Sequence, residues 1–267
     1  MTQAFVDDSS DGNISMLGGW VADDAEWKRF TNRWAEVLRQ EPKINYFRHH
    51  EAKTDPPTGE FENWTSEKID SKIMKLVDVI CEHEMYGVVV GLKNDTHWKA
   101  FEGSMLSKKQ LQSVLKLVHP YHLCFFAMTA CVLQIERESG NNKRQVDFIF
   151  DEQGRLLKTC AKIFRDFKAA FPKELKALAG AVSEANDRQV AALQAADLLV
   201  GQMVTQFRLP RPEVFFQKMV TCHKVFSSTA YIPNFELVPG IIRRLNVAWS
   251  TKRLSELREQ EEEKTKA

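Results

Sequence analysis

Residues 5–12, Phe5-Val6-Asp7-Asp8-Ser9-Ser10-Asp11-Gly12, decide the fold of this chain. A short apolar run ends at a pair of carboxylates and then breaks into a polar Asp-Gly turn. Apolar residues resume at Ile14 and continue to Val21, so the segment predicts a β-hairpin. A buried strand that ends in acids can hold a metal ion or a catalytic proton. The other interpretation is a surface turn with solvated Asp residues.

The same design recurs in the middle of the chain. The predicted strand Val146-Asp147-Phe148-Ile149-Phe150 runs directly into Asp151 and Glu152. Functional sites in open α/β sheets form at the carboxyl ends of the strands. Two neighbouring strands that both end in acids would therefore place Asp7 and Asp151 side by side.

A third acid lies in a predicted helix that spans residues 188–207. Between Arg188 and Arg208 the only charged residue is Asp197. It falls in an apolar stripe at helical spacing, together with Val190, Leu193, Val200 and Val204. A carboxylate in such a stripe is costly unless it caps a loop, pairs with an Arg, is protonated or binds a metal ion.

Three converging carboxylates would repel one another, because no Lys or Arg directly adjoins them in the sequence. A divalent cation removes this repulsion, and hard oxygen ligands select Mg²⁺ or Mn²⁺ over zinc. Such clusters serve two-metal phosphoryl transfer, in which one ion activates a water and the other stabilises the leaving oxygen. The sequence therefore predicts Mg²⁺ or Mn²⁺ as the cofactor.

The three stretches, in this order, resemble the family called domain of unknown function 3800, whose members are similar to the ribonuclease H-like superfamily. The family's opening Asp-Glu-Ser-Gly corresponds to the segment that begins at Asp7. Its mid-chain Asp-Glu corresponds to Asp151-Glu152, and its Gln-x-x-Asp-Leu-x-x-Gly helix to residues 194–201. Two departures are Asp8 in place of Glu and the insertion of residues 10–11 before the glycine. The resemblance covers roughly residues 4–205.

The resemblance implies an α/β fold with a ribonuclease H-like mixed sheet, in which an opening antiparallel hairpin is followed by parallel strands. Helices would flank the sheet, and a helical extension would follow at the C-terminus. The first strand would be central, the mid-chain strand beside it, and the late helix packed over their ends. The implied metal ligands are Asp7, Asp151 and Asp197.

A fourth acid is usual in ribonuclease H-like nucleases. Glu51, which follows a predicted strand at residues 44–47, is the first choice, and the further candidates are Asp8, Glu152 and Asp187. Glu51 is therefore a candidate catalytic residue, and Asp8 and Glu152 are candidate metal ligands. With Glu51, the adjacent His49 and His50 could form a metal-binding or general-acid element, but isolated His pairs in loops are more often plain surface residues.

One domain is expected over residues 1–250, followed by a charged tail at 251–267. Alternating strands and helices indicate one sheet with helical layers. Further helices are predicted at 24–40, at 66–84, at 107–138 with a break at Pro120, and from residue 155 to 171. Further strands are predicted at 86–92, 144–150 and 177–182, with a loop at 183–187.

The composition limits which binding partners and which cellular compartment are expected. A net charge of +1 gives no global footprint for nucleic acid or an anionic membrane, so any polyanion-binding surface must be local. The five cysteines are odd in number and scattered, which argues against a disulfide framework and against a thiolate zinc site. With no signal-peptide pattern and no apolar run long enough to span a membrane, a reducing, cytoplasmic setting without a membrane partner is expected.

The leading hypothesis is a divalent-metal-dependent nuclease that acts on DNA or RNA, with metal-bound water as the nucleophile. One alternative is an interaction or sensing protein on the same fold, in which catalysis is weak or absent and the acids are structural. The neutral overall charge favours this alternative. A small-molecule phosphoesterase is the third possibility.

Overall fold

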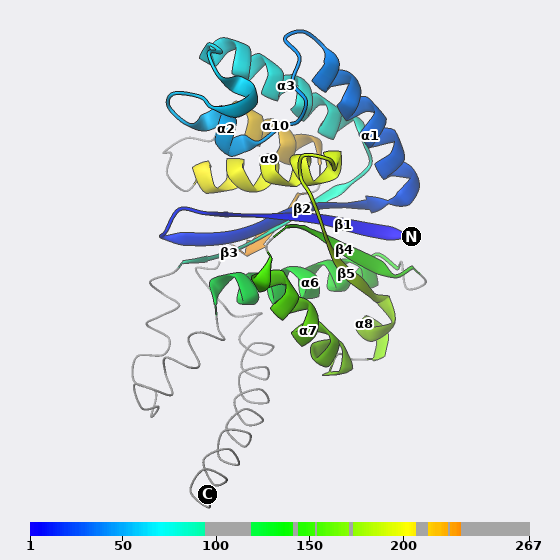
Figure 1. Cartoon of the computed structure of the whole chain (residues 1–267). Helices are drawn as coiled ribbons and strands as arrows, with labels where there is room; N and C mark the ends of the chain where they lie inside the picture. Colours follow the sequence, from blue (N-terminus) through cyan, green and yellow to red (C-terminus); the bar gives the residue numbers. More distant parts are fainter. Residues whose placement is uncertain are drawn as a thin grey trace, which may run out of the picture.

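In the computed structural model, residues 1–93, 119–140, 144–152, 154–170, 173–206, 213–223 and 225–230 are described. They form a six-stranded sheet with the order β5-β4-β1-β2-β3-β6 (Figure 1). The strands are β1 Thr2–Ser10, β2 Ile14–Asp23, β3 Tyr86–Lys93, β4 Val146–Asp151, β5 Ala179–Ala185 and β6 Val225–Ala230. The sequence that opens the chain is therefore central in the sheet.

The sheet is mixed. β2 pairs antiparallel with both β1 and β3, whereas β4 runs parallel to β1, β5 parallel to β4, and β6 parallel to β3. The predicted α/β class, with a mixed sheet that opens on an antiparallel hairpin, is confirmed, although β3, the next strand, pairs antiparallel with β2. Gly12 has a φ of +85° in the hairpin turn, where a residue without Cβ is favoured.

Helices cover both faces of the sheet (Figure 1). On one face lie α1 Asp24–Arg39, α2 His49–Lys53, the 3₁₀ turn η1 Gly59–Phe61, α3 Ser66–Glu82, α9 Ala191–Gln206 and α10 Val214–Cys222. On the other lie α6 Pro120–Glu138, α7 Arg155–Ala170 and α8 Lys173–Leu178. Two apolar cores result, one on each side of the sheet.

Successive side chains of β1 point alternately into the two cores. Ala4 and Val6 belong to the core beneath α6, whereas Phe5 packs against the core beneath α9. Gly18 on β2, the pairing partner of Asp7, lets α9 approach closely, since a Cβ at this position would lie 3.0 Å from Val200 Cβ. The helix that carries Asp197 is thereby held against the middle of the sheet.

The strand predicted at residues 44–47 is absent, and this segment is a loop. Its apolar residues Ile44 and Phe47 are buried, which explains the strand-like pattern. Their N–H groups donate to Leu38 O at 3.0 Å and to Gln194 Oε1 at 3.1 Å, not to a neighbouring strand. The loop predicted at 183–187 is also partly wrong, because β5 extends to Ala185.

The argument against disulfide bonds from the scattered cysteines is wrong for one pair. Cys81 at the end of α3 and Cys222 at the end of α10 form a disulfide across 141 residues of sequence, because α10 packs back against α3. Cys124, Cys131 and Cys160 are free thiols. The cysteine argument for a reducing compartment therefore loses its basis.

Several predictions fall outside the described residues: the part of the long helix before residue 119, the C-terminal extension beyond residue 230 and the tail at 251–267. Within the described part of the chain, no helix combines the length and apolar character needed to cross a bilayer.

Candidate active site

The candidate site lies at the end of β4, where the pairing between β1 and β4 stops. The parallel register of these strands closes with Val6 opposite Phe150, so Asp7 and Asp151 are the next residues on adjacent strands. Asp7 is buried, with 8% of its surface exposed, on the face covered by α9. Asp8 follows the alternation of the strand and lies on the other face, toward α6.

Helix α9 brings the third predicted acid to this place. Asp197 Oδ2 accepts a hydrogen bond of 2.6 Å from the backbone N–H of His49, the first residue of α2. The His49 ring lies over Gly201, where a Cβ would stand only 2.3 Å from His49 Nδ1. The Asp and the Gly of the late-helix motif thus both contribute to docking α2.

Gln194, the first residue of the same motif, joins three segments in the buried core. Its Oε1 accepts from Trp34 Nε1 at 2.9 Å and from Phe47 N at 3.1 Å, and its Nε2 donates to Asp187 O at 2.8 Å. These bonds fix α1, the loop before α2 and the turn before α9 against one another. Sequence reasoning did not foresee this role.

A fourth acid, Asp187, enters from the turn after β5. Its backbone N–H donates to Asp151 Oδ1 at 3.2 Å, and its side chain is 4% exposed and paired with Arg48. Arg48 directly precedes α2. The segment whose His49 N–H donates to Asp197 therefore also brings a positively charged guanidinium to the acids. Asp187 had been the last of the candidates for the fourth acid.

Burial and mutual repulsion raise the pKa values of these acids. Burial is the largest cause for Asp7, whose pKa lies well above its ordinary value, and the charges of Asp197, Asp8 and Asp151 raise it further. Burial raises the pKa of Asp197 to about 7, although the His49 N–H and Arg48 act in the opposite direction. For Asp151, burial and then Asp187 raise the pKa. The cluster therefore holds protons more tightly than isolated carboxylates do.

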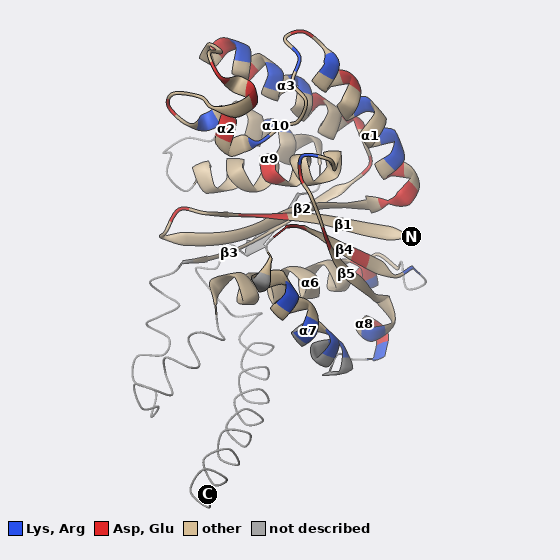
Figure 2. Ribbon diagram, viewed as in Figure 1, with Lys and Arg blue, Asp and Glu red and all other residues tan. Residues whose placement is uncertain are grey.

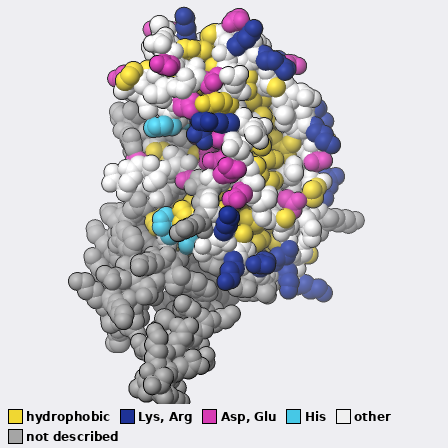
Figure 3. Space-filling model, viewed as in Figure 1, with side chains coloured by type: hydrophobic (Ala, Val, Ile, Leu, Met, Phe, Trp, Pro, Cys, Tyr) yellow, Lys and Arg dark blue, Asp and Glu magenta, His cyan; other side chains and the backbone are white. Residues whose placement is uncertain are grey.

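Asp8 belongs to the same electrostatic group although it leaves β1 on the opposite face. Burial, followed by the charge of Asp151, raises its pKa to about 6. Figure 2 shows acidic segments of β1 and α9 facing each other, and Figure 3 shows acidic side chains gathered in the middle of this face with Lys and Arg beside them.

Two other candidate acids have different surroundings. Glu51 accepts from Tyr46 OH at 3.2 Å and from the Glu60 N–H at 3.2 Å, both within its own loop. Glu152 is exposed and accepts from Asn186 Nδ2 at 3.4 Å. Of the candidates for the fourth acid, Asp187 is the one that the structure bonds directly to Asp151.

The interpretation of His49 as a surface residue is wrong. Its side chain is buried beneath α2, and Gln202 Nε2 lies 3.2 Å from His49 Nε2. Burial, followed by the charges of Lys53 and His50, lowers its pKa to about 3. The ring is therefore neutral near pH 7 and packs as part of the core.

The donor set suits a hard divalent cation in its chemistry, since it consists of buried and partly buried Asp oxygens with Arg48 beside them. One oxygen each of Asp7, Asp151 and Asp197 accepts a backbone N–H, which orients the three carboxylates. In the side-chain positions observed, however, no three His, Cys, Asp or Glu residues of the described segments form a ready metal-binding group. Metal binding would therefore need rotation of these side chains toward a common centre.

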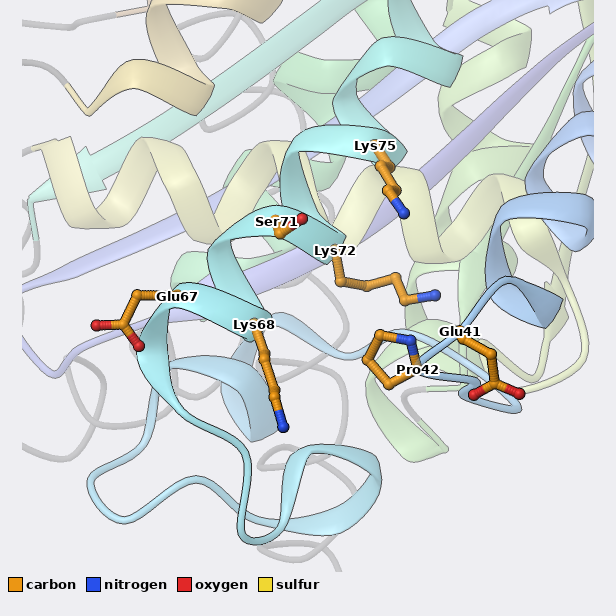
Figure 4. A pocket seen from close by; sticks show the side chains of 7 residues that line it. All are labelled: Glu41, Pro42, Glu67, Lys68, Ser71, Lys72 and Lys75. Atoms are coloured by element: carbon orange, nitrogen blue, oxygen red, sulfur yellow. The ribbon is translucent and has the colours of Figure 1, made fainter.

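A separate pocket of about 200 Å³ lies between α3 and the turn after α1 (Figure 4). It is lined by Glu41, Pro42, Glu67, Lys68, Ser71, Lys72 and Lys75. Lys72 Nζ donates to Val37 O and Gln40 O, each at 2.9 Å, and so satisfies carbonyls at the end of α1. Burial lowers the Lys72 pKa to about 8. This lysine has a structural role and none of the clustered acids lines its pocket.

A scan of the sequence against protein-family models finds no matching family, and a search of curated proteins finds no matching protein.

Proposed function

We propose that this protein is a divalent-metal-dependent nuclease of the ribonuclease H-like type, which hydrolyses phosphodiester bonds with Mg²⁺ or Mn²⁺. The observation that carries the proposal is the convergence of Asp7, Asp151, Asp187 and Asp197, which come from four separate segments. Burying these carboxylates together opposes folding, and a bound divalent cation would offset this cost.

The sheet supports the ribonuclease H-like part of the proposal. β1 lies between β2 and β4, and α9 packs on β1 and β2 near the ends that carry the acids. This is the arrangement that the resemblance in the three sequence stretches implies. The family resemblance and the metal chemistry remain proposals that rest on these shared features.

In the proposed site Asp7, Asp151 and Asp197 would be metal ligands, and Asp187 would be the fourth acid. Bound divalent ions would supply an activated water and stabilise the leaving oxygen. The backbone N–H groups of Asp8, Asp187 and His49 hold one oxygen of each proposed ligand. Only the remaining oxygens then have to turn toward a shared centre.

The proposed substrate is nucleic acid, either DNA or RNA. Arg48 lies beside the acids, and the exposed Arg188 stacks on the Tyr46 ring with its guanidinium carbon 5.0 Å from the ring centroid. Two arginines at the edge of the site would contact phosphates next to the scissile bond, as positioning contacts do in nucleic-acid complexes. A nearly neutral chain needs a local basic surface to bind nucleic acid, and these two arginines would provide it.

The first experiment compares the native protein with Asp7→Asn and with Asp24→Asn, a matched control that changes a half-buried Asp at the start of α1, which is not one of the clustered acids. Thermal unfolding is measured in EDTA and in millimolar Mn²⁺. Mn²⁺ is expected to raise the melting temperature of the native protein and of Asp24→Asn, but not of Asp7→Asn. In EDTA, Asp7→Asn should be at least as stable as the native protein, because it relieves repulsion.

The second experiment measures cleavage by the same three proteins. Single- and double-stranded DNA and RNA, and a small aryl phosphodiester, are incubated with Mn²⁺ or Mg²⁺. Cleavage of a nucleic acid should be lost in Asp7→Asn alone. No stabilisation of the native protein by millimolar Mn²⁺ would contradict the metal site. Stabilisation without any cleavage would favour the sensing protein, and cleavage of only the small ester would favour the phosphoesterase.

A further inference from the structure

Tyr121 is a buried phenol whose hydroxyl has no hydrogen-bond partner among the described residues. It lies in the first turn of α6 and is 5% exposed. A buried hydroxyl without a hydrogen bond costs free energy, so such a group in a native protein calls for an explanation.

The first turn of α6 lies on the face of the sheet toward which the Asp8 side chain points. Cys124, one turn along the helix, donates from Sγ to Ser15 O at 3.5 Å, and Ser15 pairs with Ser10 at the end of the hairpin. The start of the helix is fixed as well, because His119 Nδ1 accepts the backbone N–H of Tyr121. The first turn of α6 thus packs against the end of the β1–β2 hairpin, on the face opposite α9.

The charges that act on Tyr121 agree with this position. After burial, the charge of Asp8 is the largest cause that raises the pKa of the hydroxyl, and Asp7 and Asp151 also contribute. The phenol therefore stays protonated at neutral pH and can serve as a hydrogen-bond donor. Burial, followed by the charge of Asp8, also raises the pKa of Cys124, and the alternation of β1 places Asp8 on the face that α6 covers.

We propose that Tyr121 is a positioning residue that donates a hydrogen bond to Asp8 and directs its carboxylate toward a divalent cation in the cluster. This inference rests on the metal site of the proposed function. Asp7 and Asp8 leave β1 on opposite faces, so Asp8 lies on the side of the sheet away from α9. A hydrogen bond from Tyr121, which lies on that side, would hold the Asp8 carboxylate in place and would give the Tyr121 hydroxyl a partner.

The test uses Tyr121→Phe and a matched control, Tyr86→Phe. Tyr86 is another tyrosine of the core layer beneath α6, but its hydroxyl donates to Glu136 Oε1 at 2.7 Å, away from the acids. Mn²⁺ affinity is measured by isothermal titration calorimetry, and thermal unfolding is measured in EDTA. Tyr121→Phe should weaken Mn²⁺ binding about tenfold, as expected for a hydrogen bond to a charged group, with an unchanged or higher melting temperature in EDTA. Tyr86→Phe should show the reverse pattern, with a lower melting temperature and native Mn²⁺ affinity.

A double-mutant cycle with Asp8→Asn separates positioning from general packing. Because Tyr121 acts through Asp8, the double variant should bind Mn²⁺ about as weakly as Asp8→Asn alone. Native Mn²⁺ affinity in Tyr121→Phe, or a lower melting temperature in EDTA, would overturn the inference and leave the proposed function standing. Absence of Mn²⁺ binding in the native protein would overturn both. Mn²⁺ binding without nucleic-acid cleavage would overturn the nuclease alone.

Discussion

At the scale of single residues, Gly201 shows how little space the site leaves. Alanine in place of glycine inside a helix normally adds about 1 kcal/mol of stability. Here the new Cβ would stand 2.3 Å from His49 Nδ1, so the buried ring would have to move. Gly201→Ala is therefore expected to lower the free energy of unfolding by about 1–3 kcal/mol, as measured by urea denaturation.

The control for this prediction removes the ring. In a His49→Ala background the added methyl group meets no imidazole, so Gly201→Ala should be neutral or stabilising there. An equal loss of stability with and without the His49 ring would contradict the steric explanation.

Asp197 should make the stability of the metal-free protein depend on pH. Its pKa is about 7 in the folded protein, against 3.8 for an unperturbed Asp, so the folded state binds this proton more tightly than the unfolded state. The stabilisation from the bound proton is complete below about pH 4 and is lost as the pH rises toward 7. Asn cannot ionise, but it can still accept the His49 N–H.

The corresponding measurement compares melting temperatures of the native protein and Asp197→Asn in EDTA between pH 5 and pH 8. The advantage of Asp197→Asn should grow by several degrees as the pH rises. A difference that stays constant over this range would show that the carboxyl group is not held protonated.

At the scale of elements, α9 depends on Gln194 for its position. Gln194→Met keeps a side chain of similar length but leaves the Trp34 and Phe47 N–H groups and the Asp187 carbonyl without their partner. Each buried polar group that loses its partner costs about 1–3 kcal/mol, so a loss of at least about 3 kcal/mol is expected by urea denaturation. Gln206→Met is the control on the same helix, because Gln206 Nε2 is buried and has no hydrogen-bond partner within the described segments. It should be neutral or stabilising, and a similar loss in both variants would refute the argument.

The elements that sequence reasoning predicted correctly are those with a local pattern. The hairpin turn, the β-branched run of β3 and the amphipathic spacing of α1 and α3 all lie within about 20 consecutive residues. The loop at residues 44–47 has the same local pattern as a strand. Its hydrogen bonds go to Leu38 and to Gln194, and the bond to Gln194, 147 residues away, could not be inferred from spacing.

The same limit applies to the candidate site. Asp7 and Asp151 follow from apolar strands that end in acids, and the position of Asp197 follows from one charge in an apolar helix. Asp187 and Arg48 are 139 residues apart, and their pairing depends on how the turn after β5 meets the start of α2. Tyr121 gave no signal, because a tyrosine in an apolar helix looks like an ordinary core residue.

At the scale of the whole molecule, the disulfide closes a large ring. The bond from Cys81 to Cys222 encloses β3, α6 to α8, β4, β5, α9 and α10, and leaves β1, β2, α1 and α2 outside. Asp151, Asp187 and Asp197 lie within the ring, whereas Asp7, Asp8 and Arg48 lie outside it. The candidate site is thus formed partly by residues inside the disulfide-closed ring and partly by residues of the N-terminal segment outside it.

Such a ring changes what a protease can release. A single cut anywhere between residues 82 and 221 would leave two fragments that stay joined through the sulfur atoms of Cys81 and Cys222. Limited proteolysis should give one band of full mass on a denaturing gel without reductant and two smaller bands after reduction. Cys222→Ser should give two bands in both lanes, and separation of the native fragments without reductant would contradict the disulfide. A chain nicked within the ring would thus keep all the acids of the site in one covalent molecule.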